Sequence, residues 1–168
     1  TRYRVHKNTV TTFPDQFADV GGVRARPSKV VGAIVEDANG RRFALLAAHL
    51  ISQRSNNDTK RLAQAEALAT SRDWLVERYG VEHVLTMGDM NDTPGSAAMN
   101  RLSLAGNGEK VSWNPAEPGE CSYSYQSKCR LIDHILVSRS LLGGNFGTIN
   151  VPRKYSDHRV VWYRVSRY

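Results

Sequence analysis

The apolar positions of the chain fall into short runs separated by polar turns, and one longer stretch has helical spacing. Residues 30–35 and 43–50 are apolar runs joined by an Asn-Gly pair, which predicts a β-hairpin with a tight turn. Residues 84–87 form another apolar strand. Between the second and third of these strands, apolar residues at helical spacing predict a helix that ends at Gly80. They are Leu62, Ala65, Leu68, Ala69, Leu75, Val76 and Tyr79. Strands with a helix between them predict a layered α/β or α+β domain.

Short strand patterns continue in the second half of the chain. "CSYSY" and "LIDHILVS" predict two strands, "SRSLLGGN" a short helical turn, and "SDHRVVWYRV" a final strand. A helix is also expected to start at Asp92 or Thr93, because Pro94 suits a first helical turn. No repeat or low-complexity linker interrupts the pattern, and no apolar run approaches the ~18 residues that span a bilayer. We therefore interpret residues 1–168 as a single domain.

The positive net charge of the chain bears on the kind of molecule that it binds. The apolar content of 40% and the charged content of 23% are those of an ordinary globular protein. The net charge is +7, and residues 128–168 hold eight basic residues against two acidic ones. Such a surface attracts polyanions, and a well-solvated basic face explains the charge equally well.

Two cysteines, Cys121 and Cys129, lie on either side of a short turn at strand-like positions. A disulfide is geometrically allowed there, and two free thiols in a cytoplasmic protein are the alternative. A structural zinc site is not indicated, because no further Cys or Cys/His pair is present.

Chemistry-bearing residues occur at or near the ends of four predicted strands. They are His49, Asp89 with Asn91, Asp133, and Asp157 with His158. Taken singly, a histidine near a core strand is usually hydrogen-bonded there, and Asp or Asn after a strand usually forms a turn or caps a helix. The carboxylate of Asp133 is harder to explain, because inside an apolar strand it must be paired or desolvated at a large cost.

Phosphodiester hydrolysis accounts for the whole set. It needs a hard divalent cation held by oxygen ligands, and the candidate ligands are Asp89, Asn91 and Asp157. It also needs a group that activates water. His158 is the candidate base, which Asp133 would hold in the required tautomer. His49 is a second imidazole, suited to donate to a phosphoryl oxygen.

The ordered segments "GDMND", "LIDHILVS" and "SDHRVV", after a strand ending in "HL", resemble the endonuclease/exonuclease/phosphatase family. That family includes relatives of deoxyribonuclease I, abasic-site endonucleases, neutral sphingomyelinases and inositol-phosphate 5-phosphatases. The resemblance covers the chain almost end to end. It implies a four-layer α/β sandwich of the deoxyribonuclease I-like type. It also implies cleavage of phosphate esters with Mg²⁺, for which Mn²⁺ or Ca²⁺ could substitute.

The resemblance assigns ligands of metal and phosphate to particular positions. Asp89 and Asn91 match the metal and phosphate ligands of the family motif, and Asp157 matches the second metal carboxylate. The segment "RARP" lies where the family places a phosphate-contacting arginine before a strand. Arg26 is the better match, and Arg24 is the alternative.

The resemblance also implies which groups transfer protons. His158 matches the catalytic histidine, Asp133 the aspartate that pairs with it, and His49 the other active-site histidine. Asp92, next to the metal motif, is expected only to help start the following helix.

The start of the chain departs from the family pattern. The family begins with two strands that carry an asparagine and a metal-binding glutamate, and "TRYRV" resembles the sequence that follows them. The chain is therefore expected to be the C-terminal two-thirds of a family domain, incomplete at the N-terminus. The sequence is then a fragment, or another polypeptide completes the fold, or the protein is not catalytic; we favour the fragment. The incomplete fold would expose a sheet edge or an apolar face.

The leading interpretation is a metal-dependent endonuclease that acts on DNA rather than RNA. The charge, the "YSY" segment and the allowed disulfide resemble secreted bacterial nucleases of the family, so a secreted or periplasmic location is expected, with the cytoplasm as the alternative. A phosphatase or phospholipid phosphodiesterase of the same family is the second interpretation. The third is a non-catalytic basic fragment that binds nucleic acid.

Overall fold

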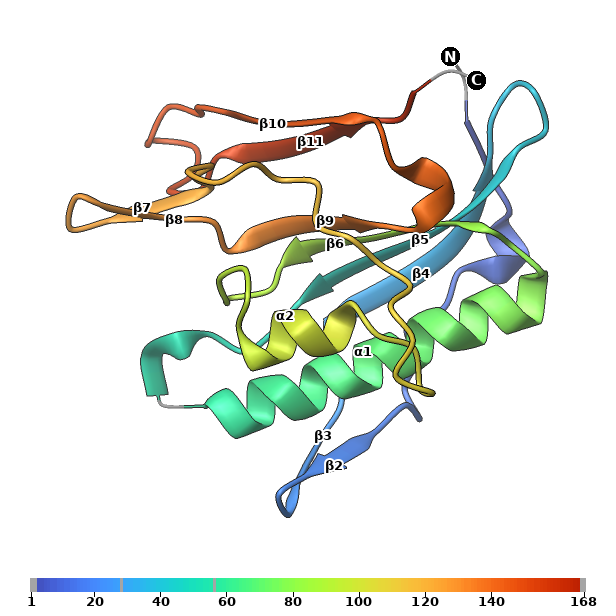
Figure 1. The fold of residues 1–168 in the computed structure, drawn as a ribbon, viewed down its shortest axis with the longest axis horizontal. Helices are drawn as coiled ribbons and strands as arrows, with labels where there is room; N and C mark the ends of the chain where they lie inside the picture. The colour runs from blue at the N-terminus through green and yellow to red at the C-terminus, as the bar shows by residue number, and fades with distance from the viewer. Residues whose placement is uncertain (1–2, 28, 56, 167–168) are drawn as a thin grey trace.

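A five-stranded mixed sheet lies at the centre of the computed structural model, which describes residues 3–27, 29–55 and 57–166 (Figure 1). Its strand order is β1-β4-β5-β6-β9. The strands are β1 (Arg4–Val5), β4 (Val30–Glu36), β5 (Arg42–His49), β6 (His83–Asp89) and β9 (Asp133–Val137). Strands β5 and β6 are parallel, and the other neighbours are antiparallel. The predicted hairpin, the third strand and the "LIDHILVS" strand are therefore confirmed.

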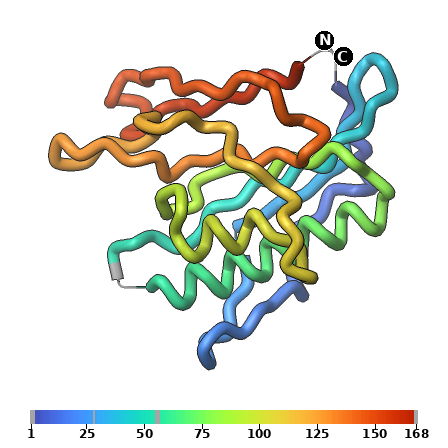
Figure 2. Tube along the Cα trace, in the orientation of Figure 1, coloured from blue at the N-terminus to red at the C-terminus, as the bar shows by residue number. Residues whose placement is uncertain are grey.

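In the described part of the chain, two helices and three hairpins surround this sheet, and the trace in Figure 2 follows them. The helices are α1 (Asp58–Tyr79) and α2 (Ala97–Leu102). The hairpins are β2 (Ala18–Val20) with β3 (Val23–Ala25), β7 (Tyr123–Tyr125) with β8 (Lys128–Arg130), and β10 (Asn145–Ile149) with β11 (Val160–Arg164). Short 3₁₀ turns are η1 (Lys7–Thr9), η2 (Gln53–Ser55) and η3 (Arg139–Leu141). None of the described helices has the length and apolar character needed to cross a membrane.

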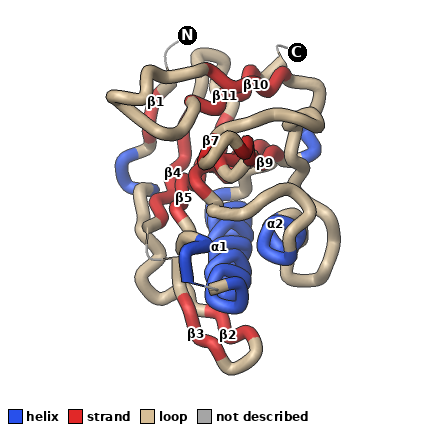
Figure 3. The backbone as a smooth tube through the Cα atoms, turned by 90° about the vertical axis from the view of Figure 1, so that its left-hand side faces the viewer, coloured by secondary structure: helices blue, strands red, loops and turns tan. Residues whose placement is uncertain are grey.

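The two faces of the central sheet are covered differently. Helices α1 and α2 lie against one face, and the β10–β11 hairpin lies over the other (Figures 1 and 3). Alternation along the strands directs Ile34 and Leu46 into the core on the helix side. Leu85 and Val137 pack in a second cluster with Val161 of β11. The result is a succession of helix, sheet and hairpin layers, as expected for an α/β sandwich.

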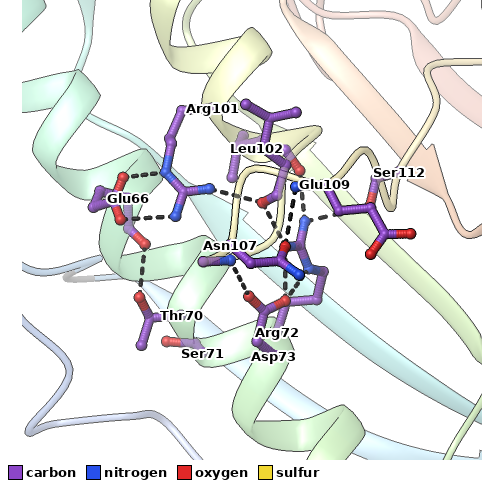
Figure 4. A network of polar contacts seen from close by, with 12 residues as sticks. Glu66, Thr70, Ser71, Arg72, Asp73, Arg101, Leu102, Asn107, Glu109 and Ser112 are labelled. Carbon is purple, nitrogen blue, oxygen red and sulfur yellow. Dashed lines mark hydrogen bonds and ion pairs between the residues drawn. The ribbon is translucent and has the colours of Figure 1, made fainter.

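A glycine cap and the polar contacts of two arginines fix the helices in place. Helix α1 ends at Gly80, whose φ of 59° and bond to the Val76 carbonyl form the predicted left-handed cap. Arg101 of α2 pairs with Glu66 of α1 (Figure 4). Arg72 is buried and donates to the backbone carbonyls of Leu102 and Leu104 over 2.6 and 2.7 Å. These bonds satisfy carbonyls at the end of α2 and tie the two helices together.

The predicted helix start at Asp92 or Thr93 is wrong. Helix α2 starts at Ala97, and the Ser96 hydroxyl caps it by accepting from the Met99 amide over 3.2 Å. Asp92 is instead buried and accepts from Arg61 Nε over 2.9 Å. An ion pair with α1 therefore takes the side chain that the sequence pattern assigned to a cap.

The β10–β11 hairpin covers only part of its face of the sheet. Val31 and Val5 are 42% and 49% exposed, and Ala47 of β5 is also exposed. Val31 lies opposite Ala47 near the carboxyl end of β5, and Val5 lies opposite Val35 at the edge of the cluster that β11 covers. An apolar strip thus continues from the covered core to the carboxyl end of β5, where His49 lies.

Candidate active site

A cleft of about 940 Å³ lies at the carboxyl ends of β5 and β6, below the β7–β8 hairpin. Figure 3 views the molecule from the end that carries this hairpin. Six polar side chains that the sequence singled out are close together here. Five of them, His49, Asp89, Asn91, Asp157 and His158, line the cleft. Asp133 joins them through its bond to His158.

Parallel pairing of β5 and β6 places His49 directly beside Asp89. The distance from His49 Nε2 to Asp89 Oδ2 is 3.6 Å. The strands approach closely because position 88 is glycine: a Cβ there would lie 2.0 Å from the Ala48 carbonyl oxygen. Gly88 also has a φ of 133°, which side-chain-bearing residues rarely adopt. The glycine of "GDMND" is thus a requirement of the site's geometry.

A tight loop holds Asn91 beyond the end of β6. Asn91 has a φ of 51°, a left-handed conformation that asparagine tolerates better than most residues. Its backbone amide donates to Asp89 Oδ1 over 2.9 Å, and its Nδ2 donates to the Leu50 carbonyl over 3.0 Å. The Leu50 amide in turn donates to the Asp89 carbonyl. The carboxamide is therefore fixed by its nitrogen, which leaves its oxygen for a ligand.

The predicted contact between Asp133 and His158 is confirmed. His158 Nδ1 donates to Asp133 Oδ2 over 2.7 Å, and Asp133 pairs in register with Asp89 on β6. His134, the next residue of β9, points to the opposite face and is buried there between Asn114 and the Asp92 carbonyl. Strand alternation thus separates a site carboxylate from a structural histidine.

The site shifts the pKa values of two groups. Burial alone would lower the pKa of His158, but the hydrogen bond and charge of Asp133, aided by Asp89 and Asp157, raise it above its usual value, as predicted. Burial is the largest cause that raises the pKa of Asp89, and the charge of Asp133 adds to it. Negative charge is therefore crowded at this point, and a cation would relieve the crowding.

The donor set fits a hard divalent cation. Ligand atoms of Asp89, Asp133 and His158 all lie within 4.8 Å of one another. Asp157 is exposed and lines the same cleft. Carboxylate and carboxamide oxygens are the ligands that Mg²⁺ and Ca²⁺ prefer. The assignment of Asp89, Asn91 and Asp157 as the ligands stays a prediction.

Two residues that the sequence did not single out support the pair of Asp133 and His158. The buried Ser122 hydroxyl accepts from the backbone amides of Ile132 and Asp133 over 3.0 and 2.9 Å, which fixes the start of β9. The ring of Tyr123 packs on the His158 ring at 4.8 Å between centroids. Only the aromatic "YSY" segment hinted at this contact, because it depends on how two distant segments meet.

Asp92 secures the site loop from the helix side. Besides its ion pair with Arg61, its carbonyl accepts from His134 Nε2 over 2.8 Å. Gln53 of η2 donates to its carboxylate and accepts from Arg130 of β8. Through its carboxylate and its carbonyl, Asp92 thus connects α1, η2 and β9 around the loop that carries Asn91.

The arginines of "RARP" lie outside this cleft. Arg24 and Arg26 line a neighbouring pocket, which shares His49 and Ser52 with the cleft. Arg26 Nη1 donates to the Pro14 carbonyl over 3.1 Å. Its phosphate contact therefore stays a prediction.

The structure joins Cys121 and Cys129 in a disulfide, with Cα atoms 5.6 Å apart. This separation suits such a bond. The bond closes the base of the β7–β8 hairpin, whose turn residues Gln126 and Ser127 both have positive φ, as a two-residue type I′ turn requires.

Comparison with known proteins gives one family and one fold. The sequence model of the "Endonuclease/Exonuclease/phosphatase family" matches residues 5–158. No curated protein matches the chain significantly in sequence. Among solved structures, the human Nocturnin catalytic domain with bound sulfate anion has a TM-score of 0.64 at 15% identity, over 97% of this chain and 61% of that one.

Two further structures show the same likeness. Truncated Caenorhabditis elegans TDP2 has a TM-score of 0.63 at 16% identity, over 95% of this chain and 64% of that one. A Staphylococcus aureus beta toxin mutant with bound magnesium ions has a TM-score of 0.54 at 15% identity, over 82% and 58%. The chain thus spans less than two-thirds of each, and the likeness confirms the predicted deoxyribonuclease I-like α/β fold.

Proposed function

We propose that this chain, which belongs to the endonuclease/exonuclease/phosphatase family, is part of a metal-dependent phosphodiesterase that cleaves DNA internally. One observation carries the proposal: the hydrogen-bonded pair of Asp133 and His158 lies beside Asp89 in an open cleft. A paired carboxylate and imidazole next to crowded oxygen ligands suits hydrolysis of a phosphate ester.

The residues divide the work of hydrolysis among themselves. The bond to Asp133 holds the His158 proton on Nδ1, so Nε2 accepts a proton from the attacking water. The water oxygen then bonds to phosphorus as the bond from phosphorus to the leaving oxygen breaks. A Mg²⁺ ion held by Asp89, Asn91 and Asp157 would neutralise charge on the phosphate. His49, beside Asp89, donates a hydrogen bond to a phosphoryl oxygen.

The walls of the cleft suit a polyanion with aromatic bases. Arg54, Lys128 and Arg130 line it from η2 and β8. Tyr125 of β7 lines the same wall and is 60% exposed. Cations that track a phosphate backbone, with aromatic rings between them, are typical of nucleic-acid binding sites. These features favour DNA over a sugar phosphate, although the family and the fold also include a Bacteroides thetaiotaomicron mannosyl-6-phosphatase.

The expectations of an additional N-terminal segment and of secretion are proposals. Exposed Val5 and Val31 mark the part of the sheet on which strands bearing the family's asparagine and glutamate would pack. The disulfide supports an oxidising location such as the periplasm.

The test uses the full-length protein with supercoiled plasmid, a short oligonucleotide, a sugar phosphate and a phospholipid. Nicking of the plasmid with Mg²⁺ or Mn²⁺, abolished by EDTA, is expected. Undiminished cleavage in EDTA would overturn the metal-dependent mechanism. Release of phosphate from the sugar phosphate, without nicking, would select the phosphatase instead. Salt-sensitive DNA binding without any turnover would indicate a non-catalytic binding protein.

A further inference from the structure

A second pocket of about 480 Å³ opens beside the cleft, between the β2–β3 hairpin and the start of α1. His49 and Ser52 line both cavities, so the two adjoin each other. Its size falls within the range of about 300–1,000 Å³ that small-ligand pockets occupy. A chain of nucleotides leaving the cleft past His49 would enter it.

A buried glutamine builds the floor of this pocket. Gln64 of α1 is 4% exposed, and its Nε2 donates to the Arg26 carbonyl over 3.1 Å. Its Oε1 accepts from the Ile51 amide over 2.8 Å. The end of the β2–β3 hairpin and the segment after His49 are therefore held in fixed positions relative to each other.

An exposed aromatic ring with guanidinium groups over it forms one wall. Phe17 is 44% exposed, and the Arg24 Cζ lies 4.6 Å from its ring centroid. The Arg26 Cζ lies 5.7 Å from the same centroid. The exposed part of the ring and the guanidinium plane are surfaces on which an unpaired base stacks.

Cationic side chains also line the pocket. Its four cationic side chains, from three separate segments, are all exposed: Arg24, Arg26, Lys29 and Lys60. Among the described residues, no carboxylate lines this pocket. The nearby Asp19 accepts from the Gly22 amide of its own turn, and Asp58 pairs with Arg61. Asp19 also lies opposite Arg24 in the register of the β2–β3 hairpin, but among the described residues none of the four cations forms an ion pair with a carboxylate.

We propose that this pocket binds an unpaired nucleobase, stacked on Phe17 and Arg24, together with a flanking phosphate of the DNA strand held in the cleft. The proposal rests on the proposed function and adds that the preferred substrate is single-stranded or locally unpaired DNA. Bases of an intact duplex are already stacked on one another, so they cannot occupy a one-base pocket without an unstacking cost of a few kcal/mol.

The experiment separates binding from turnover. Affinity of the full-length protein for a fluorescent single-stranded oligonucleotide is measured by anisotropy in EDTA, and hydrolysis of bis(p-nitrophenyl) phosphate is measured with Mg²⁺. Phe17→Ala should weaken single-strand binding about 5- to 150-fold, the range of one lost base stack. Arg24→Gln should reduce the slope of log affinity against log salt by about 0.7, the share of one single-strand phosphate.

A matched control comes from the other side of the molecule. Lys110 also lies over an aromatic ring, that of Trp113 at 5.6 Å, in a cavity that shares no residue with either pocket above. Lys110→Gln removes the same charge and should leave oligonucleotide affinity and its salt slope nearly unchanged. Phe17→Ala and Lys110→Gln should hydrolyse the small diester at the wild-type rate.

Each outcome decides one of the two proposals. Equal oligonucleotide affinity of wild type and Phe17→Ala, or no affinity in the wild type, overturns the base pocket. The same holds if Lys110→Gln weakens binding as much as Arg24→Gln does. If single-strand affinity depends on Phe17 but neither the diester nor DNA is hydrolysed, the base pocket stands and the proposed catalytic function fails.

Discussion

The two faces of strand β9 treat their polar residues in opposite ways. On the helix face, His134 lies between Asn114 and the Asp92 carbonyl, and burial lowers its pKa. On the other face, Asp133 bonds His158, whose pKa is raised because the nearby carboxylates outweigh the effect of burial. Although they are adjacent in sequence, His134 belongs to a network whose hydrogen bonds are satisfied, and Asp133 belongs to a cluster of charged groups.

The two faces differ in how the charges of their polar residues are balanced. Buried charges on the helix side meet an opposite charge or backbone carbonyls, as Arg61 meets Asp92 and as Arg72 meets Leu102 and Leu104. At the site, Asp89 and Asp133 lie close to each other; burial is the largest cause that raises the pKa of Asp89, and repulsion by Asp133 adds to it. Packing alone gives no reason to bring two carboxylates together, and a bound cation does.

Replacement of His158 tests most directly the face of β9 that carries the candidate active site, and it should have the largest effect on turnover. His158→Ala removes the proposed proton acceptor, so turnover should fall by at least the factor of about 10²–10⁴ that general-base catalysis supplies. DNA affinity should change little, because Lys128, Arg130 and Arg54 remain. Rates on plasmid DNA and anisotropy measure the two quantities. Wild-type turnover by this variant would remove His158 from the mechanism.

Asp133→Asn is the next largest test. An amide can hold the wrong tautomer of His158, so the rate should fall by about 10²–10⁴-fold while the fold persists. Circular dichroism and thermal melting give the control for folding. A folded Asp133→Asn protein with full activity would show that the 2.7 Å bond to His158 does not orient the base.

On the side of the sheet that the helices cover, loss of an ion pair should change the stability of the fold. Arg61→Ala leaves buried Asp92 without its cation, which should lower the free energy of unfolding by about 3–5 kcal/mol. Urea denaturation measures it, and Lys60→Ala, an exposed neighbour on α1, is the matched control. A loss under 1 kcal/mol would mean that solvent reaches Asp92 once Arg61 is gone.

The pH dependence of stability should have opposite signs for the two histidines. His134 has a lowered pKa in the fold, so the unfolded chain binds more protons below pH 6.5 and stability falls on acidification. His134→Gln should lose less stability than wild type as pH falls from 7.5 to 5.5.

His158 has a raised pKa, so its contribution to the stability of the fold is present at low pH and lost as pH rises. His158→Gln should therefore lose less stability as pH rises. Equal pH profiles for wild type and both variants would contradict this contrast.

The sequence predicted the elements with strong periodicity and the residues at strand ends. Alternation in "LIDHIL" was enough to place Asp133 and His134 on opposite faces once β9 was recognised. The role of Asp92 could not be read in this way, because its partner Arg61 is 31 residues away and the pairing depends on burial. Ser122 gave no signal either, since hydroxyls that accept from distant amides have no sequence pattern. The short β2–β3 hairpin also escaped prediction, as it lacks a long apolar alternation.

The left-handed conformation of Asn91 and the positive φ of Gly88 have a consequence for the thermodynamics of binding. Both residues hold the turn around Asp89 in its final shape through local backbone geometry and the bonds to Leu50. The conformational entropy of this loop, about 1–2 kcal/mol for each residue fixed, is therefore lost when the chain folds and not when a ligand arrives. A cation would then meet a preorganised set of oxygens, so more of its intrinsic interaction energy would remain as affinity.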